Sequence, residues 1–242
     1  MISVAGESVC YTVSQFIPDE SGGYLFSVPV AAAQMADTIT VQIVNGEDAS
    51  VTKSYTVVDY ARYVLASSQM SSYHSLVKEM LNYGAAAQTY FGYRTDSLVN
   101  AGIADGGQAE LPDSTNGEQI VSGRAEGVSF YGAALLFENK TAMRFYFAAD
   151  GDAAAYRFTV GGAEYTPVRQ GEYLCIELPG ILPQALDESV TVTVNDSLSV
   201  TYGPMNYMVR MYEKGSDTLQ ALLKAMYNYH LAAKSFVAAQ IV

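Results

Sequence analysis

Apolar residues in the first quarter of the chain alternate with polar ones in short runs. This period of two is typical of β-strands, and the runs are rich in β-branched and aromatic residues. Turn-forming clusters, DESGG at 19–23 and NGED at 45–48, separate them. The pattern predicts four strands, at residues 9–13, 24–30, 38–44 and 51–57.

The period then lengthens to between three and four residues, which indicates helices. A short helix is predicted at residues 57–67, and a Met-Ser-Ser loop at 70–72 follows it and can supply an N-cap. A longer helix then continues to Phe91. Because the loop between the two helices is short, we expect an antiparallel helical hairpin.

The long helix occurs twice in the chain. Residues 76–91 (LVKEMLNYGAAAQTYF) return as residues 222–237 (LLKAMYNYHLAAKSFV), an offset of 146, with seven identities in sixteen positions. The identical pairs are Leu76/Leu222, Lys78/Lys224, Met80/Met226, Asn82/Asn228, Tyr83/Tyr229, Ala86/Ala232 and Ala87/Ala233. An internal repeat of this kind bears on the architecture of the whole chain.

The second half opens with strands that the first half lacks, predicted at residues 128–137, 142–148 and 156–160. The correspondence with the first half then returns. Residues 171–174, 189–194 and 198–202 correspond to residues 22–25, 38–43 and 51–55, and Tyr207 corresponds to Tyr60. A second helical hairpin follows, with Gly215, Ser216 and Asp217 as its loop and cap.

We therefore predict an α+β fold of two tandem modules, each an antiparallel β-sheet or sandwich followed by a helical hairpin. The first module, residues 1–93, lacks its opening strands; residues 94–123 form a glycine-rich linker; residues 124–242 form the complete second module. A sheet without its opening strands would leave an unpaired edge. The linker can fold over this edge, the second module can dock there, or a second chain can pair with it; we favour docking between the two modules and therefore a monomer.

Several segments resemble a known repeat. They are the strand pair in 127–147 (GVSFYGAALLFENKTAMRFYF), the strands at 171–178 and 189–194, and the helix at 222–233, with a second occurrence at 76–87. The resemblance is to a β-strand-plus-helical-hairpin repeat of large secreted or surface proteins of Gram-positive (clostridial-type) gut bacteria. There it lies beside non-catalytic modules and has no assigned chemistry. The resemblance implies an extracellular or cell-wall-attached location.

Charge and hydropathy exclude two classes of partner. The chain has 13 basic and 25 acidic side chains and a net charge of −12. Nucleic-acid binding needs clustered Lys and Arg, so we predict no nucleic-acid partner. No apolar run approaches the roughly 20 residues of a transmembrane helix, so no membrane insertion is predicted. The first residues lack the regions of a signal peptide and are typical of a fragment of a longer protein.

Few residues suggest catalysis. His74 and His230 do not correspond in the repeat, and no zinc-protease, thiol-redox or serine-hydrolase motif is present. We expect both histidines to pack against helices or to lie on the surface. Paired carboxylates at 19–20, 47–48 and 187–188 leave a glycosidase open, because such pairs have no local signature.

Possible metal, phosphate and disulfide sites have simpler interpretations. Asp150 and Asp152 predict a polar hairpin turn, since a calcium loop needs several more oxygen ligands. The glycine doublets at 106–107 and 161–162 lack the lysine of a P-loop and predict turns. Cys10 and Cys175 are too few for a disulfide framework; buried free thiols are favoured and a single bridge stays open. No cofactor is predicted.

Aromatic and amide residues are the remaining candidates. The chain has 19 Tyr, 9 Phe and no Trp. Tyrosine can stack on a sugar, but many tyrosines fall on apolar helix faces, which favours packing. These are Tyr60, Tyr63, Tyr73, Tyr83, Tyr90, Tyr207 and Tyr229. Asparagine is a poor helix former, yet Asn82 and Asn228 recur in mid-helix, which predicts buried amides bonded to backbone.

Two hypotheses of function follow. The favoured one is a non-catalytic, extracellular structural or adhesive interaction module within a longer bacterial surface or secreted protein, with a protein or glycan partner. The alternative is a carbohydrate-binding module that uses exposed tyrosines. No catalytic, metal-binding or cofactor-binding residue is predicted. The candidate residues are the structural repeat positions Asn82, Tyr83, Asn228, Tyr229, Tyr60 and Tyr207.

Overall fold

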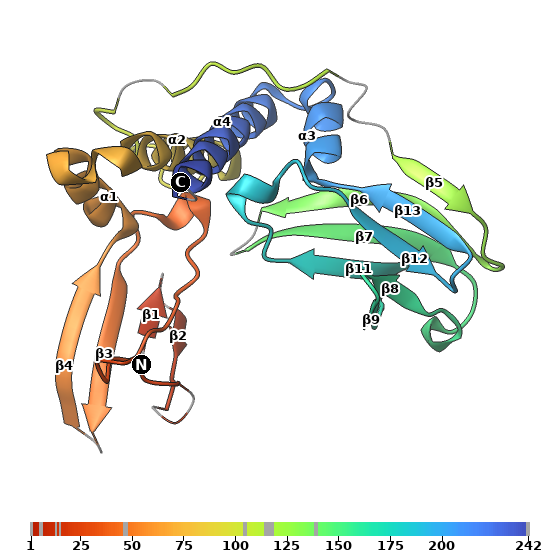
Figure 1. Cartoon of the computed structure of the whole chain (residues 1–242), viewed down its shortest axis with the longest axis horizontal. Helices are drawn as coiled ribbons and strands as arrows, with labels where there is room; N and C mark the ends of the chain where they lie inside the picture. The colour runs from red at the N-terminus through yellow and green to blue at the C-terminus, as the bar shows by residue number, and fades with distance from the viewer. Residues whose placement is uncertain are drawn as a thin grey trace. The chain divides into compact units, whose positions relative to one another are not determined.

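The fold is mixed α+β. The computed structural model describes residues 2–4, 7–12, 14, 16–45, 48–103, 106–113, 119–137 and 140–240. Its packing divides the chain into two compact units, Met1–Gly106 and Gly107–Val242. Three antiparallel sheets and four α-helices lie in the described ranges (Figure 1). No helix in these ranges is both long enough and apolar enough to cross a membrane.

The first unit holds a four-stranded antiparallel sheet. Its strands are β1 (Ile2–Val4), β2 (Glu7–Val9), β3 (Ile39–Asn45) and β4 (Asp48–Tyr55), in the spatial order β2-β1-β3-β4. The strand predicted at residues 24–30 is wrong, since only Tyr24 pairs, in an isolated bridge with Pro18. Leu25 is 86% exposed, so this apolar segment has no buried face to favour a strand.

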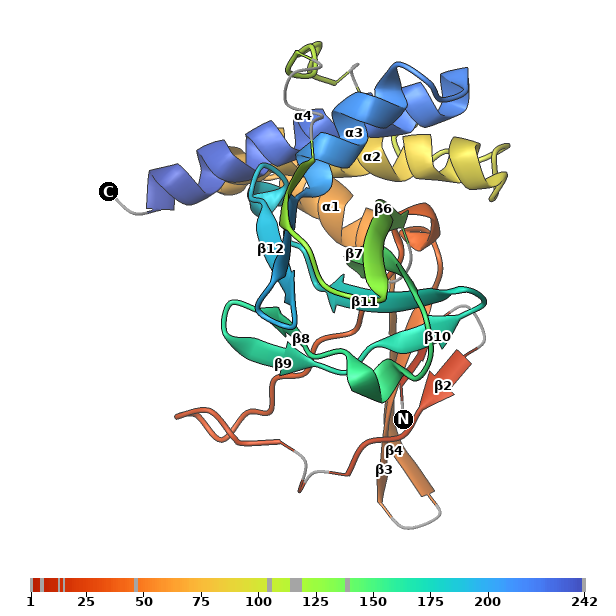
Figure 2. The same cartoon turned by 90° about the vertical axis from the view of Figure 1, so that its right-hand side faces the viewer.

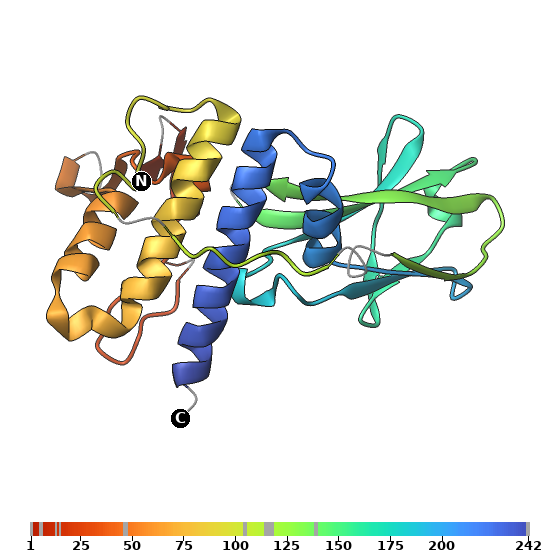
Figure 3. The same cartoon turned by 90° about the horizontal axis from the view of Figure 1, so that it is seen from above.

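Two helices follow the sheet in the first unit. A 3-10 turn, η2 (Ala32–Gln34), precedes β3; α1 (Val57–Ala66), the 3-10 segment η3 (Ser68–Tyr73) and α2 (His74–Phe91) come after β4. Thr56 caps α1, because its hydroxyl accepts a hydrogen bond from Asp59 N–H at 2.9 Å. Helices α1 and α2 lie side by side (Figure 3). Their core consists of Met35, Val58, Ala61, Leu81, Ala85 and Val99.

The first part of the predicted linker packs within the first unit. Val99 is 2% exposed, and its N–H donates to Gln88 Oε1 at 2.9 Å. Buried Asp37 accepts a hydrogen bond from Tyr93 Oη at 2.7 Å and pairs with Arg94 Nη2 at 3.1 Å. The chain after α2 is therefore held against the turn before β3.

The second unit is a β-sandwich with two helices. Its strands are β5 (Ile120–Gly123), β6 (Val128–Phe137), β7 (Thr141–Ala149), β8 (Phe158–Val160), β9 (Ala163–Tyr165), β10 (Val168–Gln170), β11 (Tyr173–Pro179), β12 (Val190–Val194) and β13 (Leu198–Tyr202). One sheet has the order β10-β11-β7-β6 and the other β5-β13-β12-β8-β9 (Figures 1 and 2). The two sheets meet through Phe147 and Phe158, whose ring centroids lie 5.1 Å apart.

Strand alternation explains why the sandwich forms. In β7 the side chains of Met143, Phe145 and Phe147 are buried, whereas the residues between them are half-exposed. Alternate side chains of a strand point to opposite faces, so each strand gives one face to the core. The remaining elements are η5 (Ala153–Ala155), η6 (Pro183–Ala185), α3 (Pro204–Tyr212) and α4 (Asp217–Gln240).

The same order of elements closes both units: a 3-10 turn, a β-hairpin, a short helix and a long helix. Val58 N–H donates to Met35 O at 3.1 Å in the first unit, and Met205 N–H donates to Leu186 O at 3.0 Å in the second. In the hairpins, Ile39 lies opposite Tyr55 and Val190 lies opposite Tyr202. These pairings follow the sequence correspondence.

The long helix meets the 3-10 turn differently in the two units. A Cβ on Gly84 of α2 would lie 2.9 Å from Met35 Sδ and 3.2 Å from Ala32 O. In the repeat, Gly84 corresponds to His230, and Ala32 corresponds to Pro183. His230 Nδ1 lies 2.7 Å from Pro183 O. The first unit therefore uses a close backbone approach where the second uses a side-chain hydrogen bond.

Replacement of Gly84 by alanine tests this close approach. Overpacking costs about 1–3 kcal/mol, while the helix propensity of alanine returns roughly 1 kcal/mol. We expect Gly84→Ala to lower the free energy of unfolding, measured by chemical denaturation. Gly132→Ala is the matched control, because a Cβ there meets nothing within 4 Å. A Gly84→Ala protein as stable as the wild type would contradict the close contact.

Candidate functional site

Asn228 of α4 is buried, with 6% of its surface exposed, and its amide bonds backbone on both sides. Its Oδ1 accepts a hydrogen bond from Ala109 N–H at 3.2 Å, and its Nδ2 donates to Lys224 O at 3.0 Å. A Cβ on Gly107 would lie 2.5 Å from Asn228 Oδ1. The amide therefore holds residues 107–109 against α4, where only glycine permits so close a passage.

Asn82 of α2 has different partners. It is half-buried, and its Oδ1 accepts a hydrogen bond from Asn100 Nδ2 at 3.0 Å. Its Nδ2 is buried without a hydrogen-bond partner in the part of the chain that the structure describes. A Cβ on Gly106 would lie 2.5 Å from that nitrogen. A glycine passes close to the side chain of Asn82, as it does to that of Asn228. The side-chain oxygen of Asn82, however, accepts its hydrogen bond from a side chain rather than from the backbone.

The repeated tyrosines differ in burial. Tyr83 is 8% exposed, Tyr229 and Tyr207 are half-buried, and Tyr60 is 66% exposed. The expectation that Tyr60 packs in the core is wrong, and so is the same expectation for Tyr63, which is 61% exposed. The sequence VVDYARYVLA offers two apolar helix faces, and the face that packs is the one with Val58, Ala61 and Val64.

Both histidines bond backbone carbonyls, as the packing interpretation expects. His74 Nε2 lies 3.0 Å from the carbonyl oxygens of Val64 and Ser67, at the end of α1. A carbonyl oxygen only accepts hydrogen bonds, so the protons lie on His74 Nε2 and on His230 Nδ1, which faces Pro183 O.

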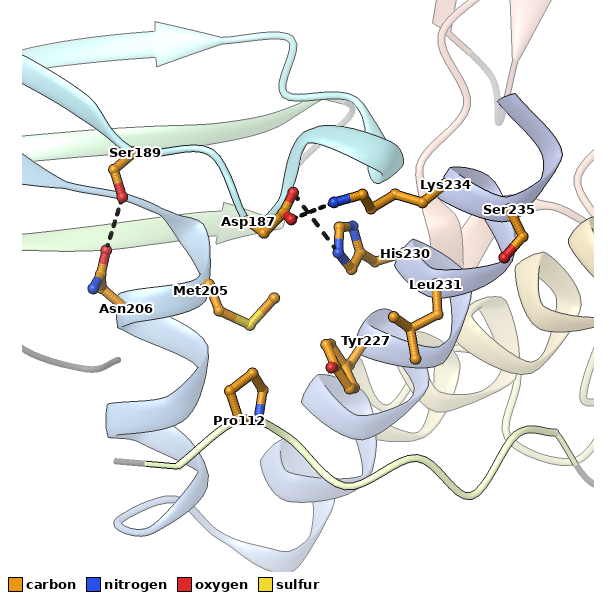
Figure 4. A pocket seen from close by; sticks show the side chains of 10 residues that line it. All are labelled: Pro112, Asp187, Ser189, Met205, Asn206, Tyr227, His230, Leu231, Lys234 and Ser235. Carbon is orange, nitrogen blue, oxygen red and sulfur yellow. Dashed lines mark hydrogen bonds and ion pairs between the residues drawn. The ribbon is translucent and has the colours of Figure 1, made fainter. Parts of the chain in front are cut away.

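A pocket of about 630 Å³ lies in the second unit and contains His230 (Figure 4). Its wall combines apolar residues with a polar group of Asp187, His230 and Lys234. The full lining is Pro112, Asp187, Ser189, Met205, Asn206, Tyr227, His230, Leu231, Lys234 and Ser235. The volume is in the range of small-molecule sites.

Lys234 and His230 flank the Asp187 carboxylate. Lys234 Nζ donates to Asp187 Oδ2, and His230 Nε2 lies 3.9 Å from Asp187 Oδ1. The hydrogen bond from Lys234 lowers the pKa of Asp187; the His230 charge acts in the same direction, and partial burial opposes both. Tyr227 stacks on the imidazole, with ring centroids 5.9 Å apart. The cluster joins the turn after η6 to α4.

The geometry of this cluster differs from that of a catalytic triad. In a triad the carboxylate holds Nδ1–H and leaves Nε2 to act on a nucleophile. Here Nδ1 bonds the carbonyl of Pro183, and the carboxylate faces Nε2. Two serines, Ser189 and Ser235, line the pocket, and the hydroxyl of Ser189 donates to Asn206 Oδ1 at 3.3 Å. The cluster is therefore arranged to connect elements.

The sequence pattern did not predict this cluster. His230 and Lys234 are four residues apart, a spacing that places them on one helix face. That spacing was the available signal, but Asp187 lies far away in sequence, in a turn where acidic residues are common. Under the repeat, the three residues correspond to Ala36, Gly84 and Gln88.

The other candidate sites are turns or free thiols. Asp152 Oδ1 accepts Ala154 N–H at 3.1 Å and caps η5. Gly161 and Gly162, with φ of +58° and +84°, form the turn between β8 and β9. Cys175 is buried, as predicted, whereas Cys10 is exposed, and both are free thiols. Within the described ranges, no three His, Cys, Asp or Glu side chains are grouped to hold a metal ion.

Comparisons with known proteins identified no relative of this chain. A scan against protein-family models, a search of curated proteins and a search of solved structures each found no match.

Replacement of Asn228 by leucine tests the buried amide. The change leaves the Ala109 N–H and the Lys224 carbonyl without their side-chain partner, and an orphaned buried group costs about 1–3 kcal/mol. We expect Asn228→Leu to lower the free energy of unfolding by that amount in chemical denaturation. Asn82→Leu is the comparison, with a loss in the same range because Asn100 Nδ2 loses its acceptor. Unchanged stability in both variants would contradict these roles.

The lowered pKa of Asp187 predicts a pH-dependent contribution to stability. The unfolded-state pKa of aspartate is about 3.9. Because the folded-state pKa lies below it, the ionised carboxylate stabilises the fold above this value. We expect the difference in unfolding free energy between wild type and Asp187→Asn to be full at about pH 5 and to shrink as the pH falls below about 4.

A Lys234→Met background is the control for this titration, because it removes the largest cause of the shift. In that background the effect of Asp187→Asn should be smaller and less dependent on pH. A difference that grows as the pH falls from 5 to 3 would contradict the assigned direction.

Proposed function

We propose that the chain is a non-catalytic, extracellular structural or adhesive interaction module within a longer bacterial surface or secreted protein. It consists of two tandem copies of one module, in each of which a sheet precedes a helical hairpin, and the described residues of the first copy hold no counterpart of the sheet β10-β11-β7-β6. Its partner is a protein or a glycan at the cell surface. One observation supports the proposal. Groups that occupy corresponding positions in the two units form hydrogen bonds that connect backbone segments within each unit.

Backbone hydrogen bonds support the duplication. The bond from Val58 N–H to Met35 O has its counterpart in the bond from Met205 N–H to Leu186 O. A pair of hydroxyl side chains also occupies corresponding positions across the β-hairpin of each unit. The hydroxyls of Thr40 and Ser54 lie 3.3 Å apart, and those of Thr191 and Thr201 lie 2.8 Å apart. These shared groups join strands, turns and helices to one another.

The polar side chains that could take part in catalysis have no equivalents in the first unit. Asp187, His230 and Lys234 occur in the second unit only, and in the first unit Ala36 and Gly84 correspond to Asp187 and His230. His230 is 2% exposed and bonds Pro183 O, the counterpart of Ala32 O against which Gly84 packs. The polar cluster thus replaces a packing contact. This substitution supports a structural role for the cluster.

The proposed compartment depends on the resemblance of residues 127–147 and 222–233 to repeats of secreted and surface proteins of Gram-positive bacteria. A monomer is the favoured state for such a unit within a long chain.

A turnover assay tests the non-catalytic proposal. The purified chain is incubated with chromogenic esters, glycosides, phosphate esters and peptides, and product release is followed against a buffer blank. We expect no release above the blank for the wild type, for Asp187→Asn or for His230→Gln. Release that rises with protein concentration and disappears in either variant would contradict the proposal.

A further inference from the structure

The sheet β10-β11-β7-β6 has one face directed away from the sandwich core. Phe145, Phe147, Leu174 and Ile176 are fully buried on the core side. The intervening residues of β7 and β11 therefore lie on the other face. That face carries Arg144, Tyr146, Tyr173, Cys175 and Glu177. The four strands can be followed in Figures 1 and 2.

A β-bulge adds Tyr131 to this outer face. Phe130 pairs with Phe147 and Gly132 pairs with Tyr146, so β6 has one extra residue between them. A bulge places two residues opposite one and redirects a side chain. Tyr131 is 67% exposed, and its ring centroid lies 4.5 Å from that of Tyr173 at an interplanar angle of 34°.

The ring of Tyr173 packs against the ring of Tyr131 and also contacts the ring of Tyr146. The centroid of Tyr146 lies 6.1 Å from that of Tyr173, with the rings at 86°. The neighbouring Tyr131 hydroxyl, followed by burial, raises the pKa of Tyr173. The bulged ring is thus held in place while much of its surface stays in contact with solvent.

Charged and amide groups adjoin the tyrosines on the same face. Arg144 lies opposite Glu177 in the β7–β11 pair, and its Nε and Nη2 donate to Glu177 Oε2 at 3.0 and 2.5 Å. Arg144 Nη1 also lies 3.4 Å from Gln170 Oε1. Glu177 is 41% exposed and Arg144 is 20% exposed at the side chain. Hydrogen-bond donors and acceptors therefore border the aromatic group.

Gly132 leaves the surface beside Tyr131 open. A Cβ at this position would meet nothing within 4 Å. Gly132 is paired with Tyr146, so the open space lies over the outer face next to the tyrosines. A ligand can approach the Tyr131 ring there without displacing a side chain of residue 132.

We propose that Tyr131, Tyr173 and Tyr146, bordered by Arg144 and Glu177, form a binding surface for a neutral carbohydrate. This inference rests on the proposed non-catalytic function and names the class of its partner. The Tyr131 ring stacks on the apolar C–H face of a sugar ring, an arrangement that suits an aromatic side chain with a polar tip. The Arg144–Glu177 pair offers donors and acceptors to the sugar hydroxyls.

The surface fits a neutral saccharide better than an anionic polymer or an apolar peptide. The chain carries a net charge of −12, which repels polyanions. The guanidinium of Arg144 already bonds Glu177 and is not an unpaired cation for a phosphate or sulfate. The exposed Tyr131 ring is bordered by polar groups, whereas an apolar peptide needs a hydrophobic groove.

Binding of the whole chain to immobilised neutral polysaccharides tests the inference. Biolayer interferometry with mannan, xylan, galactan and mixed-linkage glucan should show binding to at least one of them. Tyr131→Ala should weaken that binding at least about tenfold, as expected for a central aromatic contact. Gly132→Leu should weaken it similarly by filling the open space while all three tyrosines remain.

Tyr60→Ala is the matched control, because Tyr60 is 66% exposed and lies on α1 of the other unit. It should bind as the wild type does. Absence of binding to every neutral polysaccharide, binding only to anionic heparin or pectin, or undiminished binding by Tyr131→Ala and Gly132→Leu would overturn the inference.

A melting measurement on each variant separates lost binding from lost folding, and Gly132→Leu supplies a second, independent perturbation. Release of reducing sugar from a bound polysaccharide would contradict the non-catalytic function. Absence of binding without such release would overturn the carbohydrate inference alone.

Discussion

Each unit depends on a backbone contact between a 3-10 turn and the start of a short helix. The N–H of Val58 reaches Met35 O in one unit, and the N–H of Met205 reaches Leu186 O in the other. The first N–H groups of a helix have no partner inside the helix and need one elsewhere. Here the turn before the hairpin supplies it, so that one hydrogen bond fixes the hairpin, the short helix and the turn together. The long helix then packs against the same turn.

The position at which the long helix meets the turn explains the polar cluster of the second unit. Gly84 lets α2 approach Ala32 O directly, whereas His230 extends from α4 to Pro183 O. A buried imidazole requires a hydrogen-bond partner, and Pro183 O accepts from Nδ1, while the Asp187 carboxylate lies 3.9 Å from Nε2. Lys234 then compensates the charge of Asp187. The polar cluster thus lies at the position where the first unit has the contact between Gly84 and Ala32 O.

Sequence pattern was most informative where a strand has one buried face. The strands predicted at 128–137 and 198–202 coincide with β6 and β13, and in β13 buried and half-buried residues alternate along the strand. Residues 24–30 have similar composition without a buried face, and they form no strand. Turns η2 and η6 were not predicted, since three-residue turns have no periodicity. The bulge that exposes Tyr131 depends on pairing between strands and has no local sequence signal. The Asp187 cluster has only the four-residue spacing of His230 and Lys234 as a signal, because Asp187 is distant in sequence.

Hydrogen exchange of two amides tests the shared construction most directly. Buried backbone bonds in a packed core open only when the surrounding structure unfolds, so their amides exchange slowly. If both units are built on the turn-to-helix bond, the amides of Val58 and Met205 belong to the slowest-exchanging group of their own units. Exchange of either amide as fast as that of exposed loop residues would contradict the duplication of this contact and the structural role assigned to the repeat.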